Sequence, residues 1–292
     1  MGIEYVDRLS VTIIAENSVL HRTPYWGQHG ISILLEAYKN NVKRNILIDV
    51  AQNPEALLHN MNLMNISPST IDTIVLSHCH WDHTQGIVEI LKRIGKKDLP
   101  IIAHPDIFRL NFTVDPYLRY AGVMNSDSKE KIKENGGTLF LTSDPLQIMP
   151  GLITTGEVKR QTDFEEVGIP LRTITCDNKV VEDKMKDDTS VIANLKNKGI
   201  VIITGCSHAG IVNITKHSVE LTGVNKIMAI IGGLHLVEAP MERIKKTVEA
   251  LSELDIDLVS AGHCTGFEAQ VELYNKFKQK FSPLHTGMKF EF

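Results

Sequence analysis

Residues 77–83 have the sequence Ser-His-Cys-His-Trp-Asp-His (SHCHWDH) and directly follow the apolar segment IDTIVL, which is typical of a buried strand. In an extended segment, residues two apart point to the same side, so His78 and His80 can bind one ion. A turn just beyond them can present Asp82 and His83 to a second ion. Imidazole and carboxylate groups suit zinc, iron, manganese or cobalt, and two such ions can share an activated water. The segment therefore predicts a two-metal site.

Three later apolar segments end close to a histidine. They are GIVIITGCSH, KIMAIIGGLH and DLVSAGHC, which place His208, His235 and His263 at the ends of three predicted strands. Loops that leave the same ends of neighbouring strands meet in space. We therefore expect these histidines to converge on the first cluster.

Two histidines have more than one interpretation. His235 follows Gly232 and Gly233, which let the backbone approach a ligand closely. It either contacts the substrate or transfers a proton, or it is a buried histidine that caps a turn. His29, in QHGIS, precedes an early predicted strand and either lines the substrate site or plays no part there.

The order of the predicted elements indicates an α/β fold. Short β-rich segments open the chain near residues 11–15, 31–37 and 45–50, and a helix is predicted at 54–65. Strands then alternate with helices through the second half. A group of strands is followed by alternating strands and helices, and this pattern occurs twice along the chain. Such an order implies two mixed sheets packed face to face with helices outside.

Two stretches interrupt this order. Residues 105–136 are too long for a plain connection, so we predict an inserted lid or small subdomain there, within a single domain spanning 1–292. Its aromatic side chains either stack on a planar substrate ring or anchor the stretch to the core. Beside them, Arg109 and Arg119 are candidates for holding a substrate phosphate. Residues 159–187 carry many charges and are predicted to form an exposed excursion.

The composition narrows the functional classes. The 292 residues are 42% hydrophobic and carry a net charge of -4, so no basic field favours nucleic-acid binding. No apolar stretch has transmembrane length and the start lacks a signal-peptide pattern, so we expect a cytoplasmic protein without a membrane partner. The four cysteines are expected as thiols. A small, anionic molecule is the expected partner, and the oligomeric state is left open.

The first cluster resembles the HxHxDH signature of the metallo-β-lactamase superfamily, with an apolar strand before it and Gly86 and a predicted helix after it. The resemblance implies a four-layer αββα sandwich over nearly the whole chain. It also implies that His78 and His80 bind the first metal. Asp82 and His83 would bind the second, and Asp82 is expected to act in catalysis.

The same resemblance suggests the remaining ligands. His263 in AGHC matches the last metal histidine of the superfamily and is expected at the second metal, and His208 is expected as the third ligand of the first. Superfamily members usually carry a bridging aspartate where this chain has Cys206, which is either a ligand or a neighbour of the ligands. Asp187 or Asp188 stands where another histidine is usual and supplies a carboxylate ligand or a hydrogen bond to one.

The segments QHGIS, SHCHWDHTQG, TGCSHAGIVNI and IGGLHL are together similar to one branch, the relatives of 7,8-dihydropterin-6-methyl-4-(β-D-ribofuranosyl)aminobenzene-5'-phosphate synthase. Metal-activated water is the common tool of the superfamily, so we expect a metal-dependent hydrolase of a phosphorylated or pterin-type substrate. One alternative is the synthase reaction, a condensation with loss of pyrophosphate; another is a noncatalytic metal-sensing module. Zinc is the expected metal, with iron or manganese as alternatives. Lys159 and Arg160 are further candidates for an anion pocket.

Overall fold

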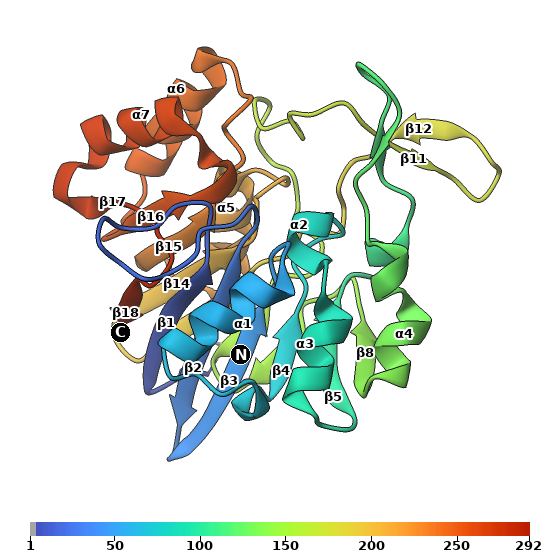
Figure 1. Ribbon diagram of the computed structural model, residues 1–292. Coiled ribbons are helices and arrows are strands. Elements are labelled where there is room, and N and C mark those ends of the chain that lie inside the picture. Colours follow the sequence, from blue (N-terminus) through green and yellow to red (C-terminus); the bar gives the residue numbers. More distant parts are fainter. Residues whose placement is uncertain (1–3) are drawn as a thin grey trace.

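The computed structural model describes residues 4–292, which form two seven-stranded sheets packed face to face with helices outside (Figure 1). In spatial order the first sheet contains β18 (Lys289–Glu291), β1 (Arg8–Ala15), β2 (Ser32–Lys39), β3 (Val42–Ile48), β4 (Thr73–Val75), β5 (Leu99–Ala103) and β8 (Gly137–Leu141). The second contains β17 (Phe281–Pro283), β16 (Val259–Gly262), β15 (Ile227–Gly233), β14 (Gly199–Thr204), β13 (Val191–Leu195), β10 (Leu152–Thr154) and β9 (Gln147–Met149). The predicted α/β sandwich is confirmed.

Helices cover both outer faces. They are α1 (Pro54–Leu63), α2 (Trp81–Thr84), α3 (Ile87–Ile94), α4 (Lys129–Glu134), α5 (Ile211–Thr222), α6 (Met241–Ser252) and α7 (Phe267–Phe277). Short 3-10 turns are η1 (Pro68–Thr70), η2 (Pro105–Phe108), η3 (Asn125–Asp127), η4 (His263–Thr265) and η5 (Lys278–Lys280). The start of α1 follows from its sequence, because the Asn53 side chain accepts hydrogen bonds from the N–H groups of Glu55 and Ala56.

Both sheets change from antiparallel to parallel pairing. In the first, β1, β2 and β3 pair antiparallel, whereas β3, β4, β5 and β8 pair parallel. In the second, β13 pairs antiparallel with β14, and β14, β15, β16 and β17 pair parallel. The loops after β4, β14, β15 and β16 contain the predicted histidines. Parallel pairing therefore brings the loops of the second sheet to one common edge.

The main core lies between the two sheets. Val11 and Ile33 of the first sheet are fully buried there together with Val201, Ile203 and Ala229 of the second. Two further apolar clusters lie on the outer faces, one against α1 and α3 and the other against α5, α6 and α7. Strands buried on both faces make a rigid support for the loops at their ends.

A third, four-stranded sheet joins the two stretches that interrupt the predicted order. It contains β12 (Val180–Glu182), β11 (Leu171–Ile174), β6 (Phe112–Thr113) and β7 (Arg119–Tyr120). β6 pairs with β11 through Thr113 and Leu171, so residues 105–136 and 159–187 form one structural unit. Figure 1 shows β11 and β12 projecting to one side of the sandwich. The action of this unit as a lid stays a prediction.

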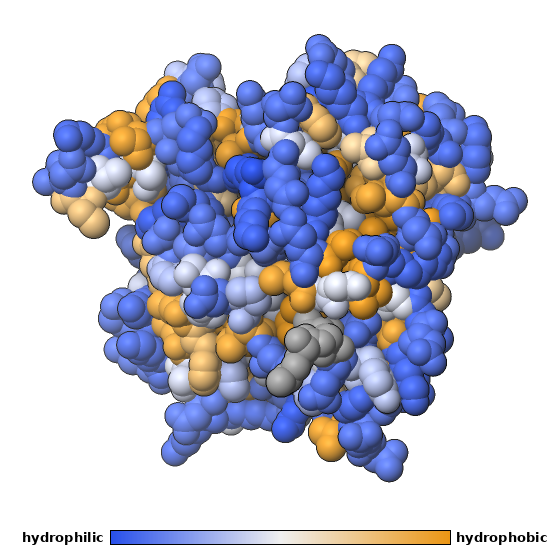
Figure 2. Space-filling model, turned by 180° about the vertical axis from the view of Figure 1, so that it is seen from behind, coloured by the Kyte–Doolittle hydropathy of each residue, from blue (hydrophilic) through white to orange (hydrophobic). Residues whose placement is uncertain are grey.

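Hydrophilic residues cover most of the face opposite to the view of Figure 1, and hydrophobic residues gather in separate patches between them (Figure 2). Within residues 4–292, no helix combines the length and the apolar character needed to cross a membrane.

Candidate metal centre

The predicted histidines meet at one edge of the sandwich. The loop after β4 and helix α2 carry the 77–83 cluster, and the loops after β14, β15 and β16 carry His208, His235 and His263. These side chains form several groups of three in which the potential ligand atoms all lie within 4.8 Å of one another. Both sheets thus contribute to one centre.

The first group contains His78, His80 and His208. The Nε2 atom of His78 lies 3.1 Å from Nδ1 of His80. Both ring nitrogens of His208 and the Nε2 atom of His80 are buried without a hydrogen-bond partner. Buried imidazole nitrogens are normally satisfied, so these unpaired atoms fit a metal ion as their missing partner.

The second group contains Asp82, His83 and His263. The Nε2 atoms of His83 and His263 are 3.2 Å apart. The Oδ2 atom of Asp82 lies 3.5 Å from Nε2 of His83 and 3.3 Å from Nε2 of His263. Two imidazole nitrogens and one carboxylate oxygen therefore converge on one point. This donor set fits a divalent transition metal.

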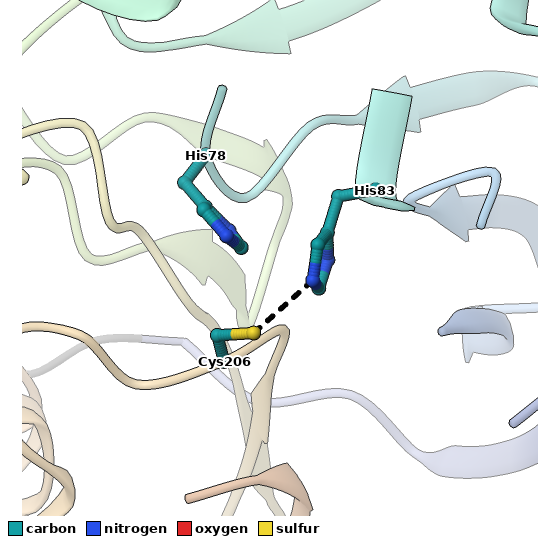
Figure 3. A group of neighbouring side chains, drawn as sticks. All are labelled: His78, His83 and Cys206. Atoms are coloured by element: carbon teal, nitrogen blue, oxygen red, sulfur yellow. Dashed lines mark hydrogen bonds between the residues drawn. The ribbon is translucent and has the colours of Figure 1, made fainter. Parts of the chain in front are cut away.

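Cys206 lies between the two groups. Its Sγ atom is 3.1 Å from Nε2 of His83, and it also forms a potential ligand group with His78 and His83 (Figure 3). Further groups join it to His208 and to His263. The thiol therefore occupies a position from which it can contact ions held by either group.

Asp49, at the end of β3, orients the ligand histidines, and the sequence analysis missed it. Its Oδ2 atom lies 2.6 Å from Nδ1 of His83 and accepts a hydrogen bond from the Ser77 hydroxyl, while its Oδ1 accepts one from the Ser77 backbone. The same hydroxyl lies 2.9 Å from Nδ1 of His78. Because Nδ1 is engaged in both rings, Nε2 is left to bind a metal. An aspartate directly after an apolar strand, as in NILID, was the available signal.

Residues from the loop after β1 support the other side of the centre. Oδ1 of Asn17 lies 2.9 Å from Nδ1 of His263, and Glu16 accepts a hydrogen bond from the His263 backbone. His29 lies at the outer edge, with Nε2 3.4 Å from Oδ2 of Asp82 and 51% of its side chain exposed. The structure thus brings His29 to the rim of the second group.

The electrostatics differ between the two groups, and only those of the first keep its imidazoles neutral for a metal. Burial lowers the pKa of His78 and His208 well below the ordinary 6.5 and that of His80 to about 4. Burial also lowers the pKa of His83, but neighbouring carboxylates, Asp82 foremost, outweigh it and raise this pKa to about 10 in the metal-free centre. Metals bind neutral imidazole, so filling the second group must release a proton from His83.

His235 adjoins the first group. Its ring centroid is 3.9 Å from that of His208, and its Nδ1 atom is buried without a hydrogen-bond partner. Its backbone has a positive φ of 47° and its N–H donates to the Cys264 thiol. The ring therefore lies beside the centre, and the choice between a role with the substrate and a structural role stays a prediction.

The paired aspartates hold the loops of the centre through backbone groups. Asp187 accepts a hydrogen bond from the backbone of Cys79, and Asp188 accepts one from the backbone of Ala209. Burial raises the pKa of Asp188 to about 7. Neither carboxylate belongs to a potential ligand group among residues 4–292. Asp188 thus fixes the loop after His208 instead of contacting the imidazole.

The two arginines predicted to hold a phosphate differ in their surroundings. Arg109 forms ion pairs with Asp183 at 2.6 Å and Asp187 at 2.8 Å, and only 14% of its side chain is exposed. Its charge is therefore already compensated within the protein, which gives it a structural role that the sequence did not indicate. Arg119 is exposed on β7, and no ion pair holds it within residues 4–292. Its binding to a substrate stays a prediction.

Comparison with known proteins agrees with this geometry. A β-lactamase superfamily domain model matches residues 44–128, which include the first ligand cluster. The chain is 41% identical over 297 residues to 7,8-dihydropterin-6-methyl-4-(β-D-ribofuranosyl)-aminobenzene-5'-phosphate synthase of Methanocaldococcus jannaschii, covering 100% of this chain and 99% of that protein. It is 34% identical to an uncharacterised protein of the same organism, covering 90% and 93%. The chain belongs to the metallo-β-lactamase superfamily and, within it, to the family that contains this synthase.

Solved structures share the fold. A metal-dependent hydrolase of the β-lactamase superfamily superimposes with a TM-score of 0.79 at 21% identity, covering 97% of this chain and 98% of that one. The metallo-β-lactamase fold protein YhfI from Bacillus subtilis gives a TM-score of 0.56 at 14% identity, covering 98% and 100%. The resemblance inferred from the sequence is confirmed.

Proposed function

We propose that the protein is a metal-dependent enzyme that joins a dihydropterin to an aminobenzene ribosyl phosphate, the product named for its M. jannaschii relative. The observation that carries this proposal is the 41% identity over the whole chain. Metal-activated water is common in the superfamily, so the sequence motifs alone favour hydrolysis. The full-length similarity to the synthase now favours the condensation.

The proposed cofactors are two divalent transition-metal ions, zinc first, with iron or manganese as alternatives. Two groups of three converging donors support them, His78, His80 and His208 in one and Asp82, His83 and His263 in the other, because three protein ligands are typical of catalytic zinc. The proposed ligands are His78, His80 and His208 for the first ion and Asp82, His83 and His263 for the second, with Cys206 between them. When bound, the ions polarise the diphosphate leaving group or lower the pKa of a bound water.

The chain's own groups have separate tasks in this condensation. The amine nitrogen bonds to the pterin methylene carbon, the carbon–oxygen bond to the diphosphate breaks, and pyrophosphate leaves with the bonding electrons. One amine proton must then be removed. We assign its acceptance to His235, whose Nδ1 atom has no hydrogen-bond partner and whose ring adjoins the first ligand group. Asp82 holds the second ion, and half-exposed His29 lines the rim beside it.

Hydrolysis of a phosphorylated substrate is the second candidate function. It is supported by the clustered imidazole and carboxylate donors, which would hold ions that activate water at coordination positions left to solvent. A noncatalytic sensor would be expected to close those positions with further protein ligands.

The test is a product assay with the metal-loaded protein. A dihydropterin diphosphate is supplied with and without an aminobenzene ribosyl phosphate, and products are separated by mass. We expect a coupled product and pyrophosphate only when both substrates are present. Release of the hydroxymethyl pterin without coupling would favour hydrolysis, and no turnover of either kind would favour the sensor. A His83→Ala variant, in which one proposed ligand is lost, is the control for metal dependence.

We also propose that the partner is a small anionic molecule, not a nucleic acid or a membrane, and that the protein acts in the cytoplasm. The net charge of -4 supports the first point. Four free cysteines support the second, because thiols persist in reducing compartments.

A further inference from the structure

Arg243 is a buried arginine without a partner. It lies on α6 with 7% exposure, and its Nε atom is buried without a hydrogen bond. Within residues 4–292, no carboxylate oxygen lies within 4.0 Å of its guanidinium nitrogens. Arg109, which is similarly buried, holds two carboxylates. A buried guanidinium is costly unless it is paired, so the surroundings of Arg243 indicate an anion that the protein itself does not supply.

The position of Gly168 shows which way this guanidinium faces. A Cβ atom at Gly168 would lie 2.9 Å from Nη1 of Arg243 and 3.6 Å from Cδ2 of His235. The φ angle of Gly168 is +91°, which also favours glycine. Because the His235 ring lies against that of His208 at a tilt of 47°, with centroids 3.9 Å apart, a short series of contacts connects Arg243 to the first group of proposed ligands.

Arg160 carries a second positive charge and lines a neighbouring cleft, which shares Gly168 with the cleft that Arg243 lines. It lines a cleft of about 690 Å³ that also borders Gly168. Its Nη1 donates to the backbone carbonyl of His208 at 3.1 Å, and its Nη2 donates to that of Lys184 at 2.6 Å. These acceptors are neutral, so the positive charge remains available for an anion.

The acidic groups nearby, Glu165 and Glu166, attract the Arg243 charge from a distance but form no ion pair with it among residues 4–292. Glu165 accepts hydrogen bonds from the backbone of Val212 and Asn213 at 2.8 Å each, which directs its carboxylate to the start of α5. Glu166 lines the clefts on both sides of Gly168 but is not ion-paired with Arg243.

We propose that Arg243 and Arg160 bind a phosphate or diphosphate group of the substrate in a subsite beside the first metal. Arginine suits this ligand because its planar donors match phosphate oxygens. This proposal rests on the proposed function, because the subsite has a role only if the substrate carries a phosphate or diphosphate group. It also explains why the anion pocket need not include Arg109, whose charge is already paired.

The test measures binding of inorganic pyrophosphate to the full-length, metal-loaded protein by calorimetry. We expect Arg243→Met and Arg160→Met each to weaken binding at least about tenfold, and Arg243→Lys to have a smaller effect because it keeps the charge. Arg44→Met is the matched control, because Arg44 is exposed on β3. Metal content is determined for every variant, so that lost binding cannot be attributed to lost metal.

The outcomes separate the subsite from the proposed function. Parental pyrophosphate affinity in Arg243→Met, or in Arg160→Met if the first variant does not fold, would overturn the subsite even if the parent protein makes the coupled product. Weakened binding in these variants, combined with a parent that makes no coupled product, would support the subsite and overturn the condensation.

Discussion

Two of the proposed ligand histidines are oriented by hydrogen bonds to Nδ1, on the side away from the proposed metals. Asp49 contacts Nδ1 of His83, and Asn17 contacts Nδ1 of His263. The other ring nitrogen of each histidine, Nε2, points into the second group, where the two Nε2 atoms lie 3.2 Å apart. Such support fixes the ring before an ion arrives and raises the affinity for it.

Asp49 therefore offers a test of this orientation. Asp49→Asn keeps the shape of the side chain but removes its charge and one acceptor, so we expect the affinity for the second metal to fall about 10- to 100-fold. Competition with a chromophoric chelator measures the change. Asp98→Asn, at an exposed position, is the control. Equal affinities of the Asp49 variant and the parent would show that His83 needs no such support.

Substitution of Cys206 tests whether a side chain between the two proposed ions contributes to their binding. A thiolate or a carboxylate there can contact both, so we expect Cys206→Asp to retain two metals per chain and Cys206→Ala to bind them more weakly. Elemental analysis after dialysis against a weak chelator distinguishes the variants. Cys176→Ala serves as the control because Cys176 is an exposed free cysteine. Undiminished metal binding by Cys206→Ala would mean that the thiol is not a ligand.

The sequence indicated which residues could be ligands but not what supports them. His208 and His263 could be named because each directly follows an apolar segment. Asp49 also follows an apolar segment, but its contact with Ser77, 28 positions further along the chain, depends on the pairing of β3 with β4 and cannot be read from the sequence. Arg243 lies in the charged segment MERIKK and reads as an exposed helix residue. Its burial depends on Gly168, which packs against it from a distant stretch.

At the scale of the elements, Arg109 ties the small sheet to the metal centre. It follows η2, and its ion pairs reach Asp183, just beyond β12, and Asp187. Asp187 in turn accepts a hydrogen bond from the backbone of Cys79, between two proposed ligands. Displacement of this sheet would therefore be transmitted to the first metal.

The Asp183 carboxylate makes this connection dependent on pH. Burial raises its pKa, but the hydrogen bonds and charge of Arg109 outweigh burial and lower the pKa below the ordinary 3.8. Because folding lowers this pKa, the ionised Asp183 carboxylate stabilises the folded protein at pH values above its ordinary pKa of 3.8. This stabilisation is lost as the pH falls below 3.8 through the lower pKa of the folded protein. We expect Asp183→Asn to lower the free energy of unfolding by about 3 kcal/mol at pH 7.

This loss should shrink as the pH falls below 3.8, because the parent carboxylate is then protonated as well. Urea unfolding in the presence of a chelator measures it without a contribution from metal release. Asp177→Asn, at an exposed position of the small sheet, should leave the free energy nearly unchanged. A difference between Asp183→Asn and the parent that does not vary with pH would contradict the account.

Helices and strands were predicted correctly where the pattern of apolar residues extended over enough positions to show a helix or a strand. The helix predicted at 54–65 is α1, and the apolar strands of both sheets were recognised. Residues 105–136 were predicted only as an inserted lid or small subdomain, and the strands β6 and β7 within them, two residues long each, were not recognised. Strands this short show no alternation, and their partner β11 comes from a separate stretch of the chain.

For the whole molecule, the proposed ions connect the two sheets. His83 follows the first sheet and His263 the second, and their Nε2 atoms are 3.2 Å apart. Metal that binds only the folded protein stabilises it, by about 2.7 kcal/mol for each ion present at 100 times its dissociation constant.

We therefore expect removal of both ions with a chelator to lower the unfolding temperature by about 5 °C or more. Calorimetry with and without readdition of zinc measures this shift, and a His83→Ala and His263→Ala double variant should show a smaller one. An unfolding temperature that is the same with and without metal would contradict a connection between the sheets.

The two-metal centre is the central claim, and anomalous diffraction from crystals of the active protein tests it most directly. The account predicts two ions per chain, one contacting His78, His80 and His208 and the other contacting Asp82, His83 and His263. A fully active protein with a single ion or none, or with either set of side chains turned away from its ion, would contradict it.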